Sequence, residues 1–365
     1  VSIVLKRAPQ MDAVLEKYLR DPLKNMKPQQ LVNVFRIGMA QLVFLETPPH
    51  AAVDTTVALA EEAGIAHHKP LVNAVMRRLT QEGFPKTEAR EAGRLNTPDW
   101  LWREWMKDYG VETALDIAAA NMGEAPVDFT VKGDPVAWAE KLEAVLLPTG
   151  SLRRKDAGFV PALKGFENGE WWVQGAAAAL SVRCIPELKG KTVIDLCAAP
   201  GGKAAQLAVA GARVIAVDRS ASRLERLKEN MARLHFSVET VVADGAVWQP
   251  PEKVDAVLLD APCTATGTIR HQPDVLRLKD MRDQEKLVVL QRRLLVNAVG
   301  MLKTGGILVY CTCSLQKAEG EDQAAWLLAQ NLPVQRLPID DEILADMITD
   351  KGDLRALPFH WREKG

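Results

Sequence analysis

Two of the five cysteines in this 365-residue chain stand side by side near its end, separated by a single threonine. Cys311 and Cys313 follow the apolar run 308–310, which is typical of the end of a buried strand. A disulfide, core packing and a nucleophilic thiol are all compatible with such a pair. A zinc site is disfavoured, because no further Cys or His ligands stand at suitable spacing. Periodicity does not separate the two thiols, since alternate residues of a strand point to the same face.

Four aspartates also follow strand-like runs in the second half of the chain. They are Asp195, Asp218, Asp244 and Asp260. One aspartate after a strand is often only a helix cap, so each of them alone has two interpretations. Four at successive strand ends favour a ligand site, because ligands of parallel sheets bind beyond the carboxyl ends of the strands.

The turn after the first of these strands indicates the kind of ligand. It reads Ala-Ala-Pro-Gly-Gly-Lys over 198–203, whereas dinucleotide sites carry Gly-x-Gly-x-x-Gly, and no Walker pattern occurs. The acid at 218, 23 positions after Asp195, suits a ribose diol. S-adenosylmethionine has no phosphate and needs carboxylates for its ribose, adenine and amino group. We therefore expect S-adenosylmethionine as the cofactor and disfavour an NAD-dependent oxidoreductase.

A third cysteine stands in the turn that follows a later strand, Asp260-Ala-Pro-Cys263. Amino-methylating enzymes commonly place an aromatic residue where Cys263 stands. A cytosine C5 is too weak a nucleophile to attack a methyl donor, but addition of a thiolate to C6 activates it. A base must then remove the C5 proton so that the thiol is released. Two cysteines and an acid near one methyl donor satisfy that scheme.

These residues would be positioned by the alternation of strands and helices that begins near residue 190. The segments 191–210 and 212–234 each read as strand, turn and helix, and 237–245, 254–262 and 305–314 supply further strands. Apolar strands that alternate with helices predict an α/β, Rossmann-like fold with a doubly wound, mostly parallel sheet.

The first 120 residues predict helices instead. Apolar periodicity indicates helices over 31–45, 51–64, 69–83 and 97–110, the last with Thr97 as its N-cap. Strand and helix signals mix after residue 123. We therefore predict three domains: an all-α domain over 1–122, a small α+β linker domain over 123–185 and the α/β domain over 186–365.

Composition excludes little beyond the membrane classes. The chain is 47% hydrophobic and 25% charged, has a net charge of −1 and contains no apolar run long enough to span a bilayer. Few, unevenly spaced cysteines and no signal peptide favour a reducing cytoplasm. The balanced charge argues against a uniformly basic nucleic-acid binder but permits a local patch. Either a phosphate track or a solvated face is formed by Arg77, Arg78, Arg153, Arg154 and Lys155.

The motifs together resemble the Nop2/Sun family of RNA 5-methylcytosine methyltransferases. The resemblance rests on DLCAAPGGK, VDRSASRLERLKEN, DAPCTATGTIR, LKTGGILVYCTCS and EGED, which span about 190–325. MAQLVFLETPPHAAVDTTVALA and LVNAVMRRL resemble a NusB-like RNA-binding domain, and we expect its first helices to be missing from a chain that begins at Val1. This arrangement implies methylation of cytosine C5 in 16S ribosomal RNA by a cytoplasmic monomer without a metal. The alternatives are the same chemistry on tRNA and a non-catalytic RNA-binding assembly factor.

The resemblance also implies roles for individual residues. Cys313 would be the nucleophile on C6, Cys263 would assist proton removal and product release, and Asp260 would contact the base and the methyl donor. The expected cofactor-binding residues are Ala199, Pro200, Gly201, Gly202 and Lys203 around the methionine end, Asp218 at the ribose, Arg223, Asp244 at the adenine and Asp260. Cys184, Cys197 and Cys311 would serve packing only. Departures from the family pattern at Gly175, His271 and Gln272 bear on RNA contacts more than on methyl transfer.

Overall fold

The computed structural model describes residues 1–20 and 22–360, so the last five residues of the predicted third domain lie outside the described part of the chain. The chain divides into two compact units. One comprises Val1–Gly123 and Ile269–Leu278, and the other comprises Glu124–Thr268 together with the residues from Lys279 onward. The three-domain division at residues 122 and 185 stays a prediction.

The first unit is helical. Its helices are α1 (Ser2–Leu15), α2 (Gln29–Met39), α3 (Pro49–Glu62), α4 (Lys69–Glu82), α5 (Ala89–Asn96), α6 (Asp99–Met122) and α11 (Val275–Leu278), with the short turns η1 (Leu23–Asn25), η2 (Ala40–Phe44) and η3 (Ala66–His68). Met11, Phe35 and Met76 are fully buried in one core between these helices. The sequence prediction of helices here is confirmed, but Thr97 does not cap α6. Its hydroxyl donates to the carbonyl of Gly93 and so closes α5 instead.

A small antiparallel sheet opens the second unit. Its strands are β1 (Val127–Val131), β2 (Val145–Leu146), β3 (Leu152–Arg154) and β4 (Trp171–Val173), in the order β2-β3-β1-β4, with α7 (Pro135–Lys141) and η4 (Val160–Ala162) beside them. Phe129 and Trp171 pack edge to face, with ring centroids 4.9 Å apart, and are fully buried. The aromatic pair explains how so small a sheet holds a core of its own.

The larger sheet of this unit has five parallel strands in the order β7-β6-β5-β8-β9. They are β5 (Thr192–Leu196), β6 (Arg213–Asp218), β7 (Glu239–Val242), β8 (Val254–Asp260) and β9 (Leu302–Cys311). The helices of this part are α8 (Ala176–Arg183), α9 (Gly202–Val209), α10 (Ala221–Arg233), α12 (Met281–Gly300) and α13 (Glu321–Leu328), with the turns η5 (Thr266–Thr268), η6 (Lys317–Glu319) and η7 (Glu342–Met347).

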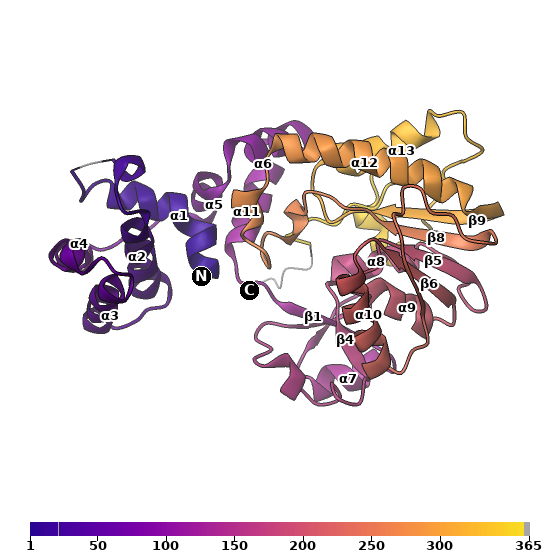
Figure 1. The fold of residues 1–365 in the computed structure, drawn as a ribbon, viewed down its shortest axis with the longest axis horizontal. Coiled ribbons are helices and arrows are strands. Elements are labelled where there is room, and N and C mark those ends of the chain that lie inside the picture. The colour runs from indigo at the N-terminus through magenta and orange to yellow at the C-terminus, as the bar shows by residue number, and fades with distance from the viewer. Residues whose placement is uncertain (21, 361–365) are drawn as a thin grey trace. The chain divides into compact units, whose positions relative to one another are not determined.

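Both faces of this sheet are covered, as Figure 1 shows. Along β5, Val193 packs toward α9 and α10, whereas Ile194 and Leu196 pack on the other side toward α12. Strands buried on both faces read as continuous apolar runs, which is why the sequence predicted them well. The expected α/β, Rossmann-like fold is confirmed. The strand order reverses between β5 and β8, the place where such sheets bind their ligands.

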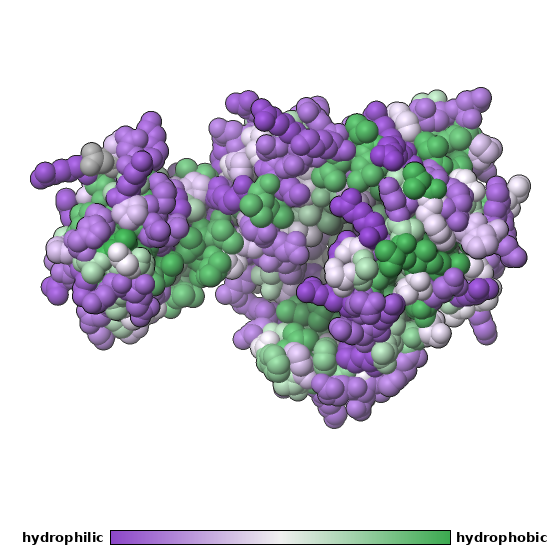
Figure 2. Space-filling model, viewed as in Figure 1, coloured by the Kyte–Doolittle hydropathy of each residue, from purple (hydrophilic) through white to green (hydrophobic). Residues whose placement is uncertain are grey.

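Hydrophilic residues cover most of the surface visible in Figure 2, and hydrophobic residues form several patches among them. Among the described residues, no helix is both long and apolar enough to cross a membrane.

Candidate active site

The structure brings together the two cysteines to which the resemblance gave catalytic roles. Cys263 follows β8 and Cys313 follows β9, and their sulfur atoms lie 3.4 Å apart although fifty residues separate them. Neighbouring parallel strands cause this approach, since Asp260 of β8 pairs in register with Cys311 of β9. Both thiols stand just beyond those paired ends.

The contact between the two sulfurs makes them chemically unequal. A hydrogen bond from the Cys263 thiol lowers the pKa of Cys313, and burial opposes this effect. The same bond, followed by burial, raises the pKa of Cys263 well above its ordinary value. Cys313 is also the more exposed residue of the two. The arrangement therefore favours a Cys313 thiolate that accepts a hydrogen bond from a Cys263 thiol.

Asp260 lies beside this pair at the end of β8. One of its carboxylate oxygens accepts a hydrogen bond from Lys203 Nζ at 2.7 Å, and the other lies 3.8 Å from Cys311 Sγ. Lys203 is therefore committed to Asp260, a pairing that the sequence did not predict for a residue of the glycine-rich turn. Cys311 is in contact with the site through Asp260, and burial raises the pKa of its thiol.

Asp195 is the most buried acid of the cluster, with 0% of its surface exposed. Neither of its carboxylate oxygens has a hydrogen-bond partner of good geometry in the described chain, although the nearby amide of Ala204 favours the ionised form. Burial raises the pKa of Asp195 to about 7, and the charge of Lys203 opposes this rise. A buried, unsatisfied acid beside a turn is typical of a ligand site.

The glycine-rich turn leads from β5 into α9. Gly201 has φ +102° and begins the helix, and a Cβ atom there would lie 2.8 Å from Leu227. Glycine is therefore required for both reasons, conformation and space. The turn is held by Asp218, which accepts from the amides of Ala199 at 3.3 Å and Ser220 at 2.9 Å.

Arg223 closes the other side of the turn. Its guanidinium lies 3.3 Å from Asp218 and donates to the carbonyl of Ala199. Asp244 is exposed after β7, where its carboxylate accepts from the amide of Ala246 at 2.9 Å. The capping interpretation of these aspartates thus holds locally, because both carboxylates order their own loops. Pro200 and Gly202 lie in the same turn.

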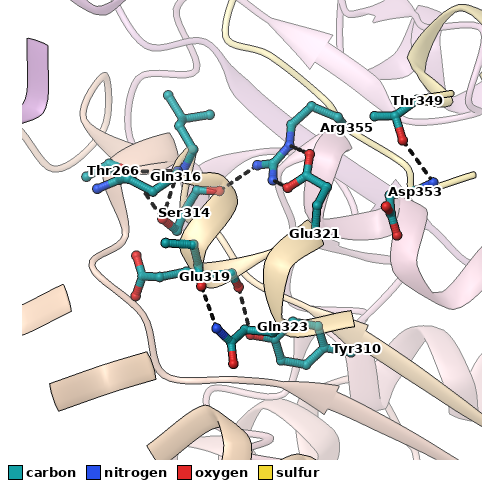
Figure 3. Close-up of polar contacts among 12 residues, drawn as sticks. Thr266, Tyr310, Ser314, Gln316, Glu319, Glu321, Gln323, Thr349, Asp353 and Arg355 are labelled. Atoms are coloured by element: carbon teal, nitrogen blue, oxygen red, sulfur yellow. Dashed lines mark hydrogen bonds and ion pairs between the residues drawn. The ribbon is translucent and has the colours of Figure 1, made fainter. Parts of the chain in front are cut away.

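A buried polar network that no sequence pattern predicted lies next to the two cysteines. Glu319, fully buried in η6, accepts hydrogen bonds from the amide of Thr264 at 3.0 Å and from Gln291 at 3.1 Å. The network continues to Ser314, whose hydroxyl lies 3.3 Å from that of Thr264. Figure 3 shows its far side, where Arg355 joins Glu321 to the carbonyl of Ser314. The "EGED" motif contains both Glu319 and Glu321. From the sequence it could be recognised only as an acidic segment, not as part of a buried network.

Cys197, Cys184 and Arg153 have surroundings that give each of them a structural role. Burial raises the pKa of Cys197 to about 12, as expected for a packing residue, and Cys184 contacts the carbonyl of Leu180. Arg153 makes two hydrogen bonds to the buried carboxylate of Asp128, at 2.7 and 2.8 Å. Arg153 therefore stabilises the small sheet.

Comparisons with known proteins show the family of this chain. Residues 185–363 match the 16S rRNA methyltransferase RsmB/F family, and residues 1–81 match the NusB family. Ribosomal RNA small subunit methyltransferase B from Xylella fastidiosa is 36% identical over 349 residues, which are 90% of this chain and 80% of that protein.

Two solved structures agree as well. The crystal structure of PH0851 superposes with a TM-score of 0.77 at 24% identity, covering 98% of this chain and 85% of that one. A methyltransferase homologue from Pyrococcus horikoshii is 26% identical with a TM-score of 0.57, covering 73% and 85%. The chain belongs to the 16S rRNA methyltransferase RsmB/F family and carries a NusB-family domain at its N-terminal end.

Proposed function

We propose that this enzyme uses S-adenosylmethionine to methylate C5 of a cytosine in 16S ribosomal RNA, through a covalent bond between Cys313 and C6. The observation that carries the proposal is the 3.4 Å contact between Cys263 and Cys313 at the strand ends that also hold Asp260. A lone nucleophile would need no second thiol at that distance. A reaction that forms and then eliminates a thioether does need a second proton carrier.

The residues divide the work as follows. The Cys313 thiolate adds to C6, which makes C5 nucleophilic, while Asp260 contacts the base near N3. Once C5 carries the methyl group, the Cys263 thiol releases its own proton to solvent water, and the resulting thiolate takes the C5 proton. The C5–H electron pair then forms the C5–C6 double bond, and the C6–S bond breaks, which returns its electron pair to Cys313 as a thiolate. The lowered pKa of Cys313 suits a nucleophile. Cys263 is suited to the later step, because its hydrogen bond to the Cys313 thiolate, the largest cause of its raised pKa, is lost once Cys313 is a thioether.

The turn residues fit a cofactor without phosphates. Lys203 is paired with Asp260 and Arg223 with Asp218, so both cations of the turn are balanced by carboxylates. A pyrophosphate would require donors and positive charge there, whereas S-adenosylmethionine offers hydroxyls, an amino group and a sulfonium. Asp218 would hold the ribose, Asp244 the adenine side, and residues 199–203 the methionine end. The cofactor supplies an electrophilic methyl group.

The test is methyl transfer followed by trapping of the adduct. With labelled S-adenosylmethionine and undermodified 16S ribosomal RNA, we expect labelled 5-methylcytosine. Cys263→Ala should accumulate a covalent protein–RNA adduct through Cys313, and Cys313→Ala should form none. Cys184→Ala, which changes a thiol outside the site, should behave as the unmodified protein does. An adduct in Cys313→Ala and none in Cys263→Ala would reverse the assignment.

The same assay separates the rival substrates. The NusB-family match and the names of the relatives favour ribosomal RNA, and label appearing only in tRNA would support the alternative. A cytoplasmic location and a monomeric state stay predictions.

A further inference from the structure

The buried network beneath the active-site thiols contains a carboxylate whose position suggests more than structural support. Glu319 is fully buried, and each of its oxygens is in contact with Thr264. Its first oxygen accepts from the Thr264 amide at 3.0 Å and from Gln291 Nε2 at 3.1 Å. Its second oxygen accepts from the Thr264 hydroxyl. Thr264 is the residue that directly follows Cys263.

The residue before Cys263 is held by the same group of side chains. Gln291 Nε2, which donates to Glu319, also donates to the carbonyl of Pro262 at 2.9 Å. Cys263 is therefore fixed on both sides, by Pro262 through Gln291 and by Thr264 through Glu319. A carboxylate that receives only donors and lies out of water forms strong, charge-assisted hydrogen bonds.

The Cys313 loop is tied to the same point. Ser314 and Gln316 both contact the hydroxyl of Thr264, each at 3.3 Å, and the amide of Gly267 donates to the carbonyl of Cys313 at 2.8 Å. The backbone of Glu319 itself accepts from the Tyr310 hydroxyl at 2.7 Å, as Figure 3 shows. Because Glu319 itself follows β9, its carboxylate joins the segment after β9 to the loop after β8 at Thr264.

We propose that Glu319 is a positioning residue that holds Cys263 against Cys313 and so sets the rate at which the RNA adduct is released. This inference rests on the proposed function, because it assumes that Cys263 completes the reaction. It adds an acid that contacts neither RNA nor cofactor but acts through Cys263. The charge of Glu319 also contributes, after the Cys313 bond and burial, to the raised pKa of Cys263 and makes its thiolate a stronger base.

The first readout is the ratio of trapped adduct to released methylated RNA. Glu319→Gln keeps the shape but loses the charge and one acceptor, so we expect this ratio to rise by about tenfold or more, since proton transfer depends steeply on placement. Thr264→Val removes one donor to Glu319 and should raise the ratio less. Leu207→Ala, a core change in α9, which supplies no residue to the network, should alter adduct formation and release together.

The second readout needs no RNA. Diamide accepts two hydrogens from two thiols as a disulfide forms, and peptide mass spectrometry follows the Cys263–Cys313 bond. With sulfurs 3.4 Å apart, the bond should form quickly in the unmodified protein and about tenfold more slowly in Glu319→Gln.

An unchanged disulfide rate, with adduct and product falling in parallel as in Leu207→Ala, would overturn the role of Glu319. If no variant formed an adduct, Cys263→Ala included, the proposed covalent mechanism would fail. The disulfide rate would still decide whether Glu319 positions the thiols.

Discussion

Asp195 offers the sharpest test of the electrostatics at this site, because its carboxylate is fully buried and poorly partnered. We predict that Asp195→Asn stabilises the catalytic unit, and that the gain grows as the pH rises. Burial raises the pKa of Asp195 from 3.8 to about 7, with Lys203 opposing the rise. In the unfolded chain the acid returns to its ordinary value. The folded protein therefore binds this proton more tightly than the unfolded chain does.

The sign and size of the effect follow from that difference. Where the folded state holds more protons, the free energy of unfolding falls as the pH rises, here between about pH 4 and pH 7. The full difference of about 3 pKa units corresponds to about 4 kcal/mol at high pH. About 2 to 3 kcal/mol of it develops between pH 5 and pH 8. The asparagine variant lacks this loss.

The assay is urea unfolding of both proteins from pH 5 to pH 8, with the stability of β5 followed by hydrogen exchange of the peptide that contains 192–196. Asp255→Asn is the matched control, because Lys303 and the Thr192 amide lower the pKa of Asp255. That acid is ionised in both states over this range, so its replacement should shift stability by a constant amount. The reasoning is refuted if the difference between Asp195→Asn and the unmodified protein is the same at pH 5 and pH 8.

Three further predictions concern the same site. Gly267→Ala should destabilise the protein by about 1 to 3 kcal/mol and slow turnover, measured by thermal unfolding and methyl transfer, since its Cβ would lie 2.7 Å from the Cys313 carbonyl oxygen. Lys203→Met should lower stability in urea by about 1 to 2 kcal/mol, because it leaves the charge of Asp260, whose side chain is 35% exposed and partly solvated, without its partner at 2.7 Å; an unchanged midpoint would contradict that pairing. Cys263→Ala should shift the pH profile of Cys313 alkylation by iodoacetamide upward, since the Cys263 hydrogen bond lowers the pKa of Cys313; a profile that stays in place would count against that bond.

The sequence by itself determined the larger sheet and the place of the site. Strands that are buried on both faces require apolar runs, as in β5, β6 and β8, and such runs are visible without any knowledge of their neighbours. Once the strands were recognised, the acids and thiols that follow them could be assigned to one edge of the sheet. Parallel strands bring their carboxyl ends together whatever their order.

Tertiary structure alone decided which of those residues interact. Strand order placed β8 beside β9, so Cys263 contacts Cys313 while Cys311 lies beside Asp260. The folded arrangement also pairs Lys203 with Asp260 and Arg153 with Asp128. From the sequence alone, both cations were equally able to bind an anion from outside the protein. A sequence offers each charged side chain many possible partners of opposite charge, and only the folded arrangement brings one of them within contact distance.

The network around Glu319 is the part of the site that sequence analysis was least able to predict. Glu319 is 55 positions from Thr264 and 28 from Gln291. No periodicity relates these residues, because each is polar in a segment where polar residues are ordinarily exposed. Burial turned them into mutual partners, since a polar group removed from water must find another. The sequence indicated which thiols and acids were candidates for the site, and the tertiary structure decided how closely they are held.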